Sequence, residues 1–521
     1  MKSFVFLFFL VGLLCVTQAS SQTVWAKYSG NPVLDAGPSG SWEVLGVGAP
    51  SVIRHLDTLK MWYSGRSTAT VYEMGYAWST DGGVSWTKYA SNPVLSPAQA
   101  WEATFLFLTD VINSGSSYKM WYTAGQSARH HIGYATSTDG RTWTRLPYPV
   151  LDPGPSSWDL QNVGWPSILG PDTLGNYKMW YSGHGTSPYL RRIGYATAAN
   201  ETIWTKYENN PVLPLGSSGS WDDGGLEAPD VLYTGGFYEM WYSGYRTSFW
   251  ADSRIGYAKS SDGISWTRHT ANPVLPTGPP GSWDVVSVTA GEIFFDGSIY
   301  QMWYTGYDGS TLRIGHAVSP KGLAVSVSTA DSVINSVDDT ISVTVRVNDP
   351  AGLQFSAKIL SGGTPLDTLE LFDDGTHGDS LASDGVFANN WIPHTAGVYS
   401  VDLVLTLHDT LRFEMKNAAV NLVTTVKNAE FIAPQGYHLS HNFPNPFNPT
   451  TEIRYQISEV SHVTLKVFDM LGREVATLVN AEMKPGSYMV TWDASGFPSG
   501  TYFYKLTAGE FVETKKLLLL R

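Results

Sequence analysis

The fold of this chain can be inferred from the stretch Tyr177-Lys178-Met179-Trp180-Tyr181-Ser182-Gly183, which Ile193-Gly194-Tyr195-Ala196 follows. Its Met-Trp-Tyr triplet occurs five times, beginning at Met61, Met120, Met179, Met240 and Met302. A Gly-Tyr-Ala or Gly-His-Ala triplet follows every copy, beginning at Gly75, Gly133, Gly194, Gly256 and Gly315. A fixed period of this kind indicates a repeat architecture.

Each repeat contains four segments that are typical of β-strands. In the third copy these segments cover residues 163–169, 177–182, 192–197 and 203–207. Short runs of aromatic and β-branched residues, separated by Gly, Pro, Asn and Asp turns, favour a four-stranded antiparallel sheet. Five such sheets around an axis predict a five-bladed β-propeller over residues 23–322.

The two ends of the repeat region predict how the ring closes. The last copy ends after Gly315-His316-Ala317 and lacks the Ser-Trp-Thr strand of the other copies. A segment of the missing kind, Thr23-Val24-Trp25-Ala26-Lys27-Tyr28, precedes the first copy instead. We therefore expect residues 23–28 to form the outer strand of the fifth blade, which would remove an exposed sheet edge.

The composition agrees with an all-β protein of several domains. At 521 residues the chain is too long for a single core. Gly (51), Tyr (28) and Trp (20) are abundant, and only 15% of the residues are charged. A net charge of -13 without a basic run argues against nucleic-acid binding. We expect a monomer.

The N-terminus predicts a secreted protein. Lys2 is followed by an apolar run over residues 4–16 and then by Thr17-Gln18-Ala19, which is typical of a signal peptide over residues 1–19. The only cysteine, Cys15, lies in this segment, so the mature chain is expected to have neither disulfides nor a thiol nucleophile. No later apolar run is long enough to span a bilayer.

A second domain is expected over residues 323–424. Alternating runs such as residues 341–347 predict an Ig-like β-sandwich there. Four acidic side chains of this region could form a Ca²⁺ loop of oxygen ligands. The same residue types are favoured in exposed turns, and we prefer that interpretation, so no cofactor is expected apart from this candidate Ca²⁺ site. The four residues are Asp373, Asp374, Asp379 and Asp384.

A polar linker over residues 425–437 leads to a last module over residues 438–521. This module opens with Leu439-Ser440-His441-Asn442-Phe443-Pro444-Asn445-Pro446-Phe447-Asn448-Pro449 and continues with residues 467–475, 499–506 and 515–521. These motifs, in this order, resemble the C-terminal sorting domain of the type IX secretion system. The short alternating strands independently favour a second Ig-like sandwich. The resemblance implies the type IX secretion machinery as a partner, and export across the outer membrane with release or attachment at the cell surface.

Motifs that recur in every repeat are expected to have structural roles. The turn from Ser79 to Trp86 resembles the Asp-box of sialidases, in which the Asp accepts backbone hydrogen bonds. Met-Trp-Tyr lies on the strands where sheets pack face to face, so its aromatic rings are expected to pack. The same argument applies to five Trp-Asp or Trp-Glu pairs, which begin at Trp42, Trp101, Trp158, Trp221 and Trp283.

Function is expected where the repeats differ, at the axial cavity. In each predicted sheet, the first strand begins on one face of the propeller. The loop between the second and third strands of that sheet lies on the same face. Alignment of these starts reveals four carboxylates that occur in only one or two blades. Clustered carboxylates are what glycoside hydrolysis needs, one as a protonated acid and one as a base or nucleophile. The candidates are Glu227, Asp230, Asp110 and Glu292.

Side chains in the same loops could hold a polysaccharide or oligosaccharide. Aromatic rings stack on the apolar faces of pyranoses, although loop aromatics also form small loop cores. The candidates for substrate binding are Trp165, His184, Tyr245, Trp250 and Tyr307.

Residues 48–54 and 63–65 resemble the first blade of five-bladed glycosidases such as glycoside hydrolase family 43. That family carries an Asp before the Pro of the first blade as base, an orienting Asp in the third blade and an acidic Glu in the fourth. Glu227-Ala228-Pro229 resembles the position of the acid, whereas Ala49 and Trp165 occupy the other two positions. The resemblance therefore implies a hydrolase only if Asp110, Asp230 or Glu292 substitutes as partner. The alternative is a non-catalytic carbohydrate-binding or surface-display propeller.

Overall fold

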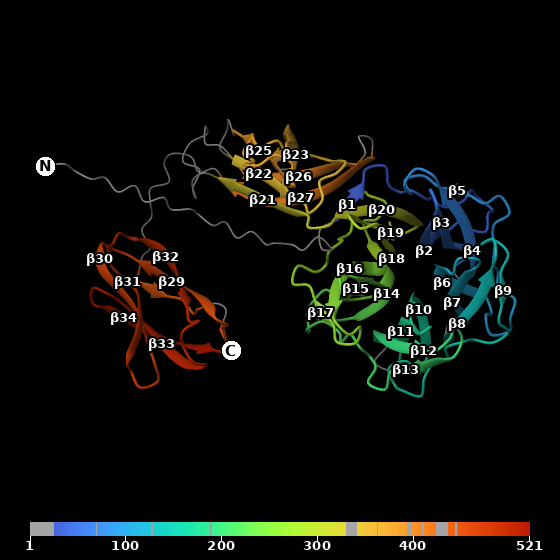
Figure 1. The fold of residues 1–521 in the computed structure, drawn as a ribbon, viewed down its shortest axis with the longest axis horizontal. Coiled ribbons are helices and arrows are strands. Elements are labelled where there is room, and N and C mark those ends of the chain that lie inside the picture. The colour runs from blue at the N-terminus through green and yellow to red at the C-terminus, as the bar shows by residue number, and fades with distance from the viewer. Residues whose placement is uncertain are drawn as a thin grey trace. The chain divides into compact units, whose positions relative to one another are not determined.

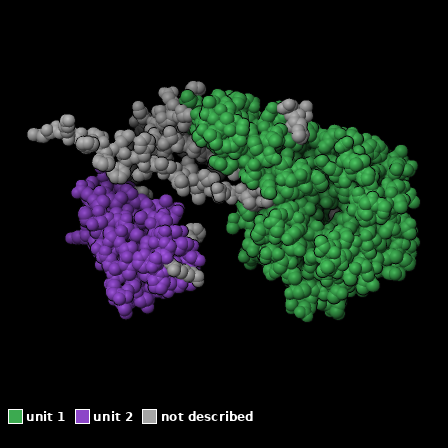
Figure 2. All heavy atoms as spheres, viewed as in Figure 1, with its two compact units in different colours: residues 1–424 green, residues 425–521 purple. Residues whose placement is uncertain are grey.

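The computed structural model describes residues 25–68, 70–126, 129–186, 190–329, 341–361, 363–392, 398–407, 411–423, 436–442 and 445–520. The signal peptide expected at 1–19, residues 23 and 24 of the expected closing strand, and most of the expected linker at 425–437 lie outside the described residues. The chain folds into two compact units, residues 1–424 and 425–521 (Figure 2). The fold class is all-β, as the sequence predicts, and the only helix in the described ranges is α1 (Phe249–Asp252).

The first unit contains five four-stranded antiparallel sheets among the described residues. Figure 1 shows them around a ring, with the first strand of each sheet on the inside. The first sheet contains β2 (Gly46–His55), β3 (Thr58–Arg66), β4 (Tyr72–Ser79) and β5 (Thr87–Lys88). The second sheet contains β6 (Phe105–Asn113), β7 (Tyr118–Gln126), β8 (Arg129–Ser137) and β9 (Thr144–Arg145). The third sheet contains β10 (Asn162–Leu169), β11 (Tyr177–His184), β12 (Arg191–Ala198) and β13 (Trp204–Lys206). The fourth sheet contains β14 (Gly225–Thr234), β15 (Phe237–Tyr245), β16 (Arg254–Ser260) and β17 (Thr267–Arg268). The fifth sheet is β18 (Ser287–Phe295), β19 (Ile299–Tyr307), β20 (Leu312–Pro320) and β1 (Ala26–Tyr28).

The N-terminal strand completes the fifth sheet. β1 pairs antiparallel with β20, with Ala26 opposite Val318 and Lys27 opposite Ala317. Lys27 Nζ lies 2.7 Å from Asp284 Oδ2, as Lys88 Nζ of the first sheet lies 2.6 Å from Glu43 Oε1. β1 therefore takes the place that β5 takes in the first sheet, and it carries the same ion pair.

The aromatic triplet of each repeat holds neighbouring sheets together. All five of its tryptophans have no exposed surface. Trp62 Nε1 donates to the carbonyl oxygen of Gly140 in the next sheet at 2.7 Å, Trp180 to that of Gly263 at 2.8 Å and Trp303 to that of Gly83 at 3.0 Å. The acceptors lie in the Asp-box turns, so both repeated motifs have the structural role that the sequence predicts.

The Trp-Asp and Trp-Glu pairs form a second repeated device. Their carboxylates are buried, and each pairs with a cation on the outermost strand of its own sheet. Burial of a charge is tolerated when a partner and hydrogen bonds compensate it. The pairs are Lys27–Asp284, Lys88–Glu43, Arg145–Glu102, Lys206–Asp159 and Arg268–Asp222.

A β-sandwich follows the ring in the same unit. One sheet contains β21 (Ala324–Thr329), β22 (Ile341–Arg346) and β25 (Val386–Trp391), and the other contains β24 (Thr364–Leu371), β23 (Leu353–Ser361), β26 (Val398–Leu407) and β27 (Leu411–Val423). Buried side chains of both sheets, such as Val343 and Phe355, share one core. β27 also pairs with the free edge of β1, with Tyr28 opposite Phe413. One strand thus belongs to the ring and to the sandwich.

The second unit is a smaller two-sheet structure. Its sheets are β28 (His438–Leu439), β29 (Thr450–Ile457), β32 (Gly486–Asp493), and β31 (Glu474–Met483), β30 (Ser461–Phe468), β33 (Gly500–Ala508), β34 (Phe511–Leu519). Alternating buried residues of both sheets, such as Ile453 and Leu465, form its core. Residues 443 and 444 of its opening motif lie outside the described residues.

Candidate functional site at the propeller axis

The side chains closest to the axis form a closed ring of hydrogen bonds. Each first strand contains a register shift, for example between Gly48 and Ser51, and a residue directly after the shift, or one position later in β6, accepts a backbone N–H from the next sheet. The five bonds join Ser51 Oγ to Val111 N (3.1 Å), Asp110 Oδ2 to Ile168 N (2.5 Å), Ser167 Oγ to Val231 N (3.0 Å), Asp230 Oδ2 to Ile293 N (2.8 Å), and Glu292 Oε2 to Val52 N (3.3 Å). Three of the four candidate carboxylates therefore meet at the axis, where they hold neighbouring sheets.

The same three carboxyl groups perturb one another. Burial raises the pKa of Asp110 to about 7. Burial and the charge of Asp110 raise the pKa of Asp230, and burial with the charges of Asp230 and Asp110 raises that of Glu292. Like charges that are close together and poorly solvated cannot all ionise. At neutral pH this group therefore retains protons.

A second set of hydrogen bonds between neighbouring sheets lies nearer to the N-terminal ends of the first strands, before the register shift. Ala49 N–H donates to Thr305 Oγ1 of the preceding sheet at 2.7 Å, and Trp165 N–H donates to Thr123 Oγ1 at 2.8 Å. Ala49 and Trp165 have φ values of 52° and 53° in the left-handed region, which costs energy for residues with a Cβ. These two positions, where the glycosidase family has carboxylates, thus serve backbone geometry in this chain.

The start face is where the five first strands begin, at Gly46, Phe105, Asn162, Gly225 and Ser287. On this side, Asp110, Asp230 and Glu292 line a cavity of about 30 Å³. A cavity of that size holds a water molecule, whereas small-molecule sites typically measure roughly 300–1,000 Å³. A sugar ring does not fit between the three carboxyl groups and the start face.

Glu227 lies apart from the other three carboxylates. It is completely buried at the start of β14 and forms an ion pair with Arg191 Nη1 through Oε1. It lines a separate cavity of about 10 Å³ with His130, Asn162 and Trp165 among others. Burial raises the pKa of Glu227 to about 7, although Arg191 acts in the opposite direction. Sequence comparison of the blades had grouped the four acids, but the structure brings only three together.

The candidate binding aromatics pack mainly on one another. Trp165 is 7% exposed and Tyr245 is 5% exposed, whereas Trp250 and Tyr307 are half-buried. α1 places Phe249 6.2 Å from Trp165 and Trp250 6.2 Å from Tyr307 between ring centroids. These side chains cover the axis at the start face, and only Trp250 and Tyr307 keep part of their rings accessible.

His184 and three residues that the sequence analysis did not select form a polar chain beside Glu227. Asn162 Oδ1 accepts the backbone N–H of His130 at 2.7 Å, and Asn162 Nδ2 lies 3.1 Å from His184 Nδ1. Arg191 lies over the Trp165 ring, with 5.7 Å from Cζ to the centroid. Burial lowers the pKa of both histidines to about 4, so both are neutral at physiological pH. Repeat comparison could have found Asn162 and Arg191, because no other blade carries these residues at the same positions.

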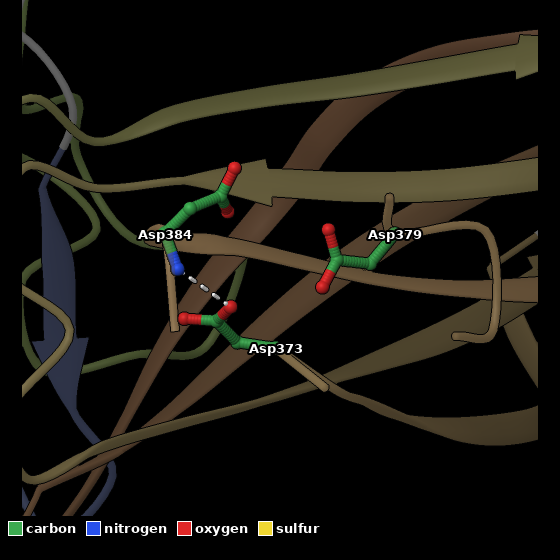
Figure 3. Close-up of side chains that lie close together, drawn as sticks. All are labelled: Asp373, Asp379 and Asp384. Carbon is green, nitrogen blue, oxygen red and sulfur yellow. Dashed lines mark hydrogen bonds between the residues drawn. The ribbon is translucent and has the colours of Figure 1, made fainter. Parts of the chain in front are cut away.

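The acidic turn of the sandwich is a separate candidate site (Figure 3). Oxygen atoms of Asp373, Asp379 and Asp384 all lie within 4.8 Å of one another, the only such metal-ligand group among the described residues. Asp373 accepts the N–H groups of Asp384 at 3.1 Å and Gly385 at 3.0 Å, and Asp379 accepts that of Gly375 at 2.8 Å. Asp374 instead contacts His377. These backbone bonds are typical of an Asp/Gly turn, and Ca²⁺ binding here stays a prediction.

Comparison with known proteins identifies the C-terminal unit. Residues 441–520 match the family described as the secretion system C-terminal sorting domain. The second unit is a type IX sorting domain. The chain is therefore exported across the outer membrane. No helix among the described residues is long and apolar enough to cross a membrane.

The chain is also similar to proteins of two kinds. Two uncharacterised proteins of Mycobacterium tuberculosis are 27% identical over 224 residues, which is 41% of this chain and 72% of theirs. One similar solved structure comes from work on the GH130 family of mannoside phosphorylases, which contains glycoside hydrolases that target β-1,2 mannosidic linkages in Candida mannan. It is 16% identical to this chain, with a TM-score of 0.48, and the match covers 58% of this chain and 95% of the other. The β-1,2-mannobiose phosphorylase from Listeria innocua is 14% identical with a TM-score of 0.47 and covers 57% of this chain and 96% of its own. With similarity this low, function has to be inferred from the residues of this chain.

Proposed function

We propose that the propeller binds carbohydrate on its start face and does not cleave it. The observation that carries this proposal is the engagement of all four candidate carboxylates in structural contacts. Asp110, Asp230 and Glu292 accept backbone N–H groups of neighbouring sheets, and Glu227 is buried against Arg191. Glycoside hydrolysis needs two carboxyl groups on either side of a bound sugar, about 5–5.5 or 6.5–9.5 Å apart. On the start face, the cavity of about 30 Å³ leaves no room for such a sugar.

The accessible parts of Trp250 and Tyr307 supply the expected contact with the glycan. Their rings lie 6.2 Å apart between centroids, and α1, which holds Trp250, is anchored by Phe249, which is 6% exposed. Rigid aromatic side chains contribute large contact areas at a low cost in conformational entropy. The surface therefore suits stacking on the apolar face of a sugar ring rather than enclosure of a whole sugar.

Binding of the mature chain to immobilised arabinan, xylan, mannan and fructan tests the proposal. We expect Trp250→Ala and Tyr307→Ala each to weaken binding about tenfold, with no release of soluble sugar by any variant. Tyr233→Ala is the matched control, because Tyr233 is 57% exposed and lies at the end of β14, away from the start face. Binding that all three substitutions leave unchanged would contradict the proposed surface.

A hydrolase with Glu227 as acid is the second candidate. It is favoured by the raised pKa of about 7, which keeps a carboxylic acid protonated near neutral pH, and by Glu227 Oε2, which has no hydrogen-bond partner among the described residues. This candidate requires α1 to move away and admit substrate. It predicts release of sugar from one of the four polysaccharides, with loss of that activity in Glu227→Gln.

A further inference from the structure

The propeller has a larger cavity on the face opposite to the candidate carbohydrate surface. This end face is where the five first strands end, at His55, Asn113, Leu169, Thr234 and Phe295. Its axial cavity measures about 490 Å³ and receives side chains from all five of those strands. The size lies within the range of small-molecule sites, roughly 300–1,000 Å³.

The cavity combines apolar walls with an acidic floor. Its walls include Ile53, Ile112 and Leu169, which are half-buried, whereas Asp110, Asp230 and Glu292 lie at the bottom next to the ring of hydrogen bonds. The three carboxyl groups come from different sheets and face the axis together. An apolar site with a few convergent polar groups is the usual form of a ligand pocket.

The repeats show that the ring itself does not require these charges. Ser51 and Ser167 occupy the same position in two sheets and accept the same backbone bond through a neutral hydroxyl group. A carboxylate in that place adds a desolvation cost, although Asp230 and Glu292 also bond the hydroxyl groups of Ser167 and Ser51 in the neighbouring sheets. The backbone bond of the ring therefore does not by itself require acid in three sheets.

No cation of the protein compensates the three carboxyl groups. None of the ion pairs formed by the described residues includes Asp110, Asp230 or Glu292. Arg54 is the only basic residue among those that line the cavity in the described structure, and it is exposed with its guanidinium over the Phe294 ring at 5.0 Å. The floor therefore complements a positive charge that comes from outside the chain.

We propose that the end-face cavity binds a small organic cation, a primary amine with an apolar body. Its ammonium group donates hydrogen bonds to carboxyl groups among Asp110, Asp230 and Glu292, and its hydrocarbon part contacts the Val, Ile and Leu walls. A single metal ion fits less well, because these three carboxyl groups do not bring their oxygens within the 4.8 Å that the Asp373 group reaches. An ammonium group has three donors, so it can bond more than one of the acceptors at the floor.

The affinity for an amine should rise with pH. The charged and titratable groups that line the cavity are Asp110 on β6, Asp230 and Tyr233 on β14, Glu292 on β18 and Arg54 on β2. The hydroxyl groups of Ser167 and Ser51 bond Asp230 and Glu292. The raised pKa values keep protons on the carboxyl groups in acid, and a bound ammonium group displaces them. Binding should therefore strengthen from pH 5 to pH 8 and release protons as it does so.

Calorimetric titration of the mature full-length protein with n-hexylamine, 1-hexanol, NaCl and CaCl₂ tests the proposal. We expect binding of hexylamine that strengthens at least tenfold from pH 5 to pH 8, and none of comparable strength for the other three. Asp110→Ser, Asp230→Ser and Glu292→Ser should each weaken it at least fivefold, because serine keeps the ring bond and removes the charge. Ser243→Ala removes a bond to the Ala290 N–H of the next sheet, outside the cavity, and should leave hexylamine affinity unchanged.

Three outcomes would overturn the proposal. The first is no binding of hexylamine at pH 8 by the folded wild type. The second is equal binding of hexanol, which would show an apolar site without charge recognition. The third is hexylamine affinity that stays unchanged in all three serine variants. Thermal unfolding of each variant verifies that the ring is intact. Since the site lies on the end face, these results are independent of glycan binding.

Discussion

Glu292 on β18 accepts the backbone N–H of Val52 on β2 at 3.3 Å, and this bond joins the fifth sheet to the first. Its counterpart at the outside of the ring is the bond from Trp303 Nε1 to the carbonyl oxygen of Gly83 at 3.0 Å. The last and first sheets are thus tied in the same way as the sheets that follow one another in sequence. A residue selected as a candidate for catalysis proves to be a closing contact of the fold.

Loss of a ring acceptor should destabilise the propeller. In Ser167→Ala the N–H of Val231, which is 2% exposed, would lose its partner in a buried position. An unsatisfied buried N–H costs about 1–3 kcal/mol. We expect a decrease of that size in the free energy of unfolding, measured by urea denaturation of the mature chain. Ser114→Ala, at an exposed hairpin, is the control and should change stability by less than about 0.5 kcal/mol. Equal effects of the two substitutions would argue against the ring.

Closure by β1 should depend on the ion pair of Lys27 with Asp284. The Asp284 side chain is 3% exposed, so Lys27→Ala leaves a buried charge without its cation. Removal of one partner of a buried ion pair lowers the free energy of unfolding by about 3–5 kcal/mol. Because Lys27 is 23% exposed, we expect a loss at or below the lower end of this range. Because β1 also pairs with β27, ring and sandwich should lose stability together. Urea denaturation of the mature chain measures this loss, and Lys27→Arg, which keeps the charge, should retain most of the free energy of unfolding. If the sandwich of the wild type unfolded in a separate transition from the ring, the role of the shared strand would be contradicted.

Acid should destabilise the contact between ring and sandwich through His316. This residue replaces the Tyr of the other repeats, is 1% exposed, and stacks on Trp303 at 4.7 Å and against Phe413 of β27 at 5.3 Å. Burial lowers its pKa to about 3, below the value of about 6.5 in an unfolded chain. The folded state thus binds the proton at a lower pH than the unfolded state. The contribution of neutral His316 to the free energy of unfolding is therefore fully present above pH 6.5 and is lost as the pH decreases towards 3.

The comparison with His316→Phe isolates this effect. The wild type should lose up to about 1.4 kcal/mol per pH unit more than the variant below pH 6. Urea denaturation of both proteins at several pH values measures the difference. Parallel stability profiles of wild type and variant between pH 7 and pH 4 would exclude His316 as the cause.

Chelation should not affect the sandwich if its acidic turn needs no metal. The carboxylates of Asp373 and Asp379 already accept backbone N–H groups of the turn. We therefore expect the same thermal midpoint in millimolar EDTA and in millimolar CaCl₂. A Ca²⁺-dependent rise that disappears in Asp384→Asn would establish the metal site instead, since Asp384 contributes an oxygen to the group.

The architecture could be predicted because it is encoded five times. A motif that every repeat carries, such as Met-Trp-Tyr, can be assigned a structural role without coordinates. The orphan segment around Lys27 similarly matches a strand that the last repeat lacks, and its pairing with β20 follows from that match. The pairing of β1 with β27 could not be predicted, because sheet edges carry no sequence mark of their partner.

The site was harder to predict because side-chain direction depends on the register shift. Glu227 and Asp230 are three residues apart, but the shift of β14 lies between them, so they stand opposite Ser243 and Trp241. The sequence therefore placed Glu227 with the axial acids, whereas it faces Arg191. Ser51 and Ser167 take the aligned positions of Asp110 and Asp230 and accept the same kind of backbone bond, which residue type alone does not indicate.

The central claim, that the propeller binds glycan without cleaving it, is tested most directly by product analysis. The mature protein is incubated with arabinan, xylan, mannan and fructan, and bound polysaccharide and released sugar are measured together, with Glu227→Gln in parallel. We predict binding to at least one polysaccharide, dependent on Trp250, and no released sugar from either protein. Release of sugar by the wild type that is lost in Glu227→Gln would contradict this account and establish a hydrolase.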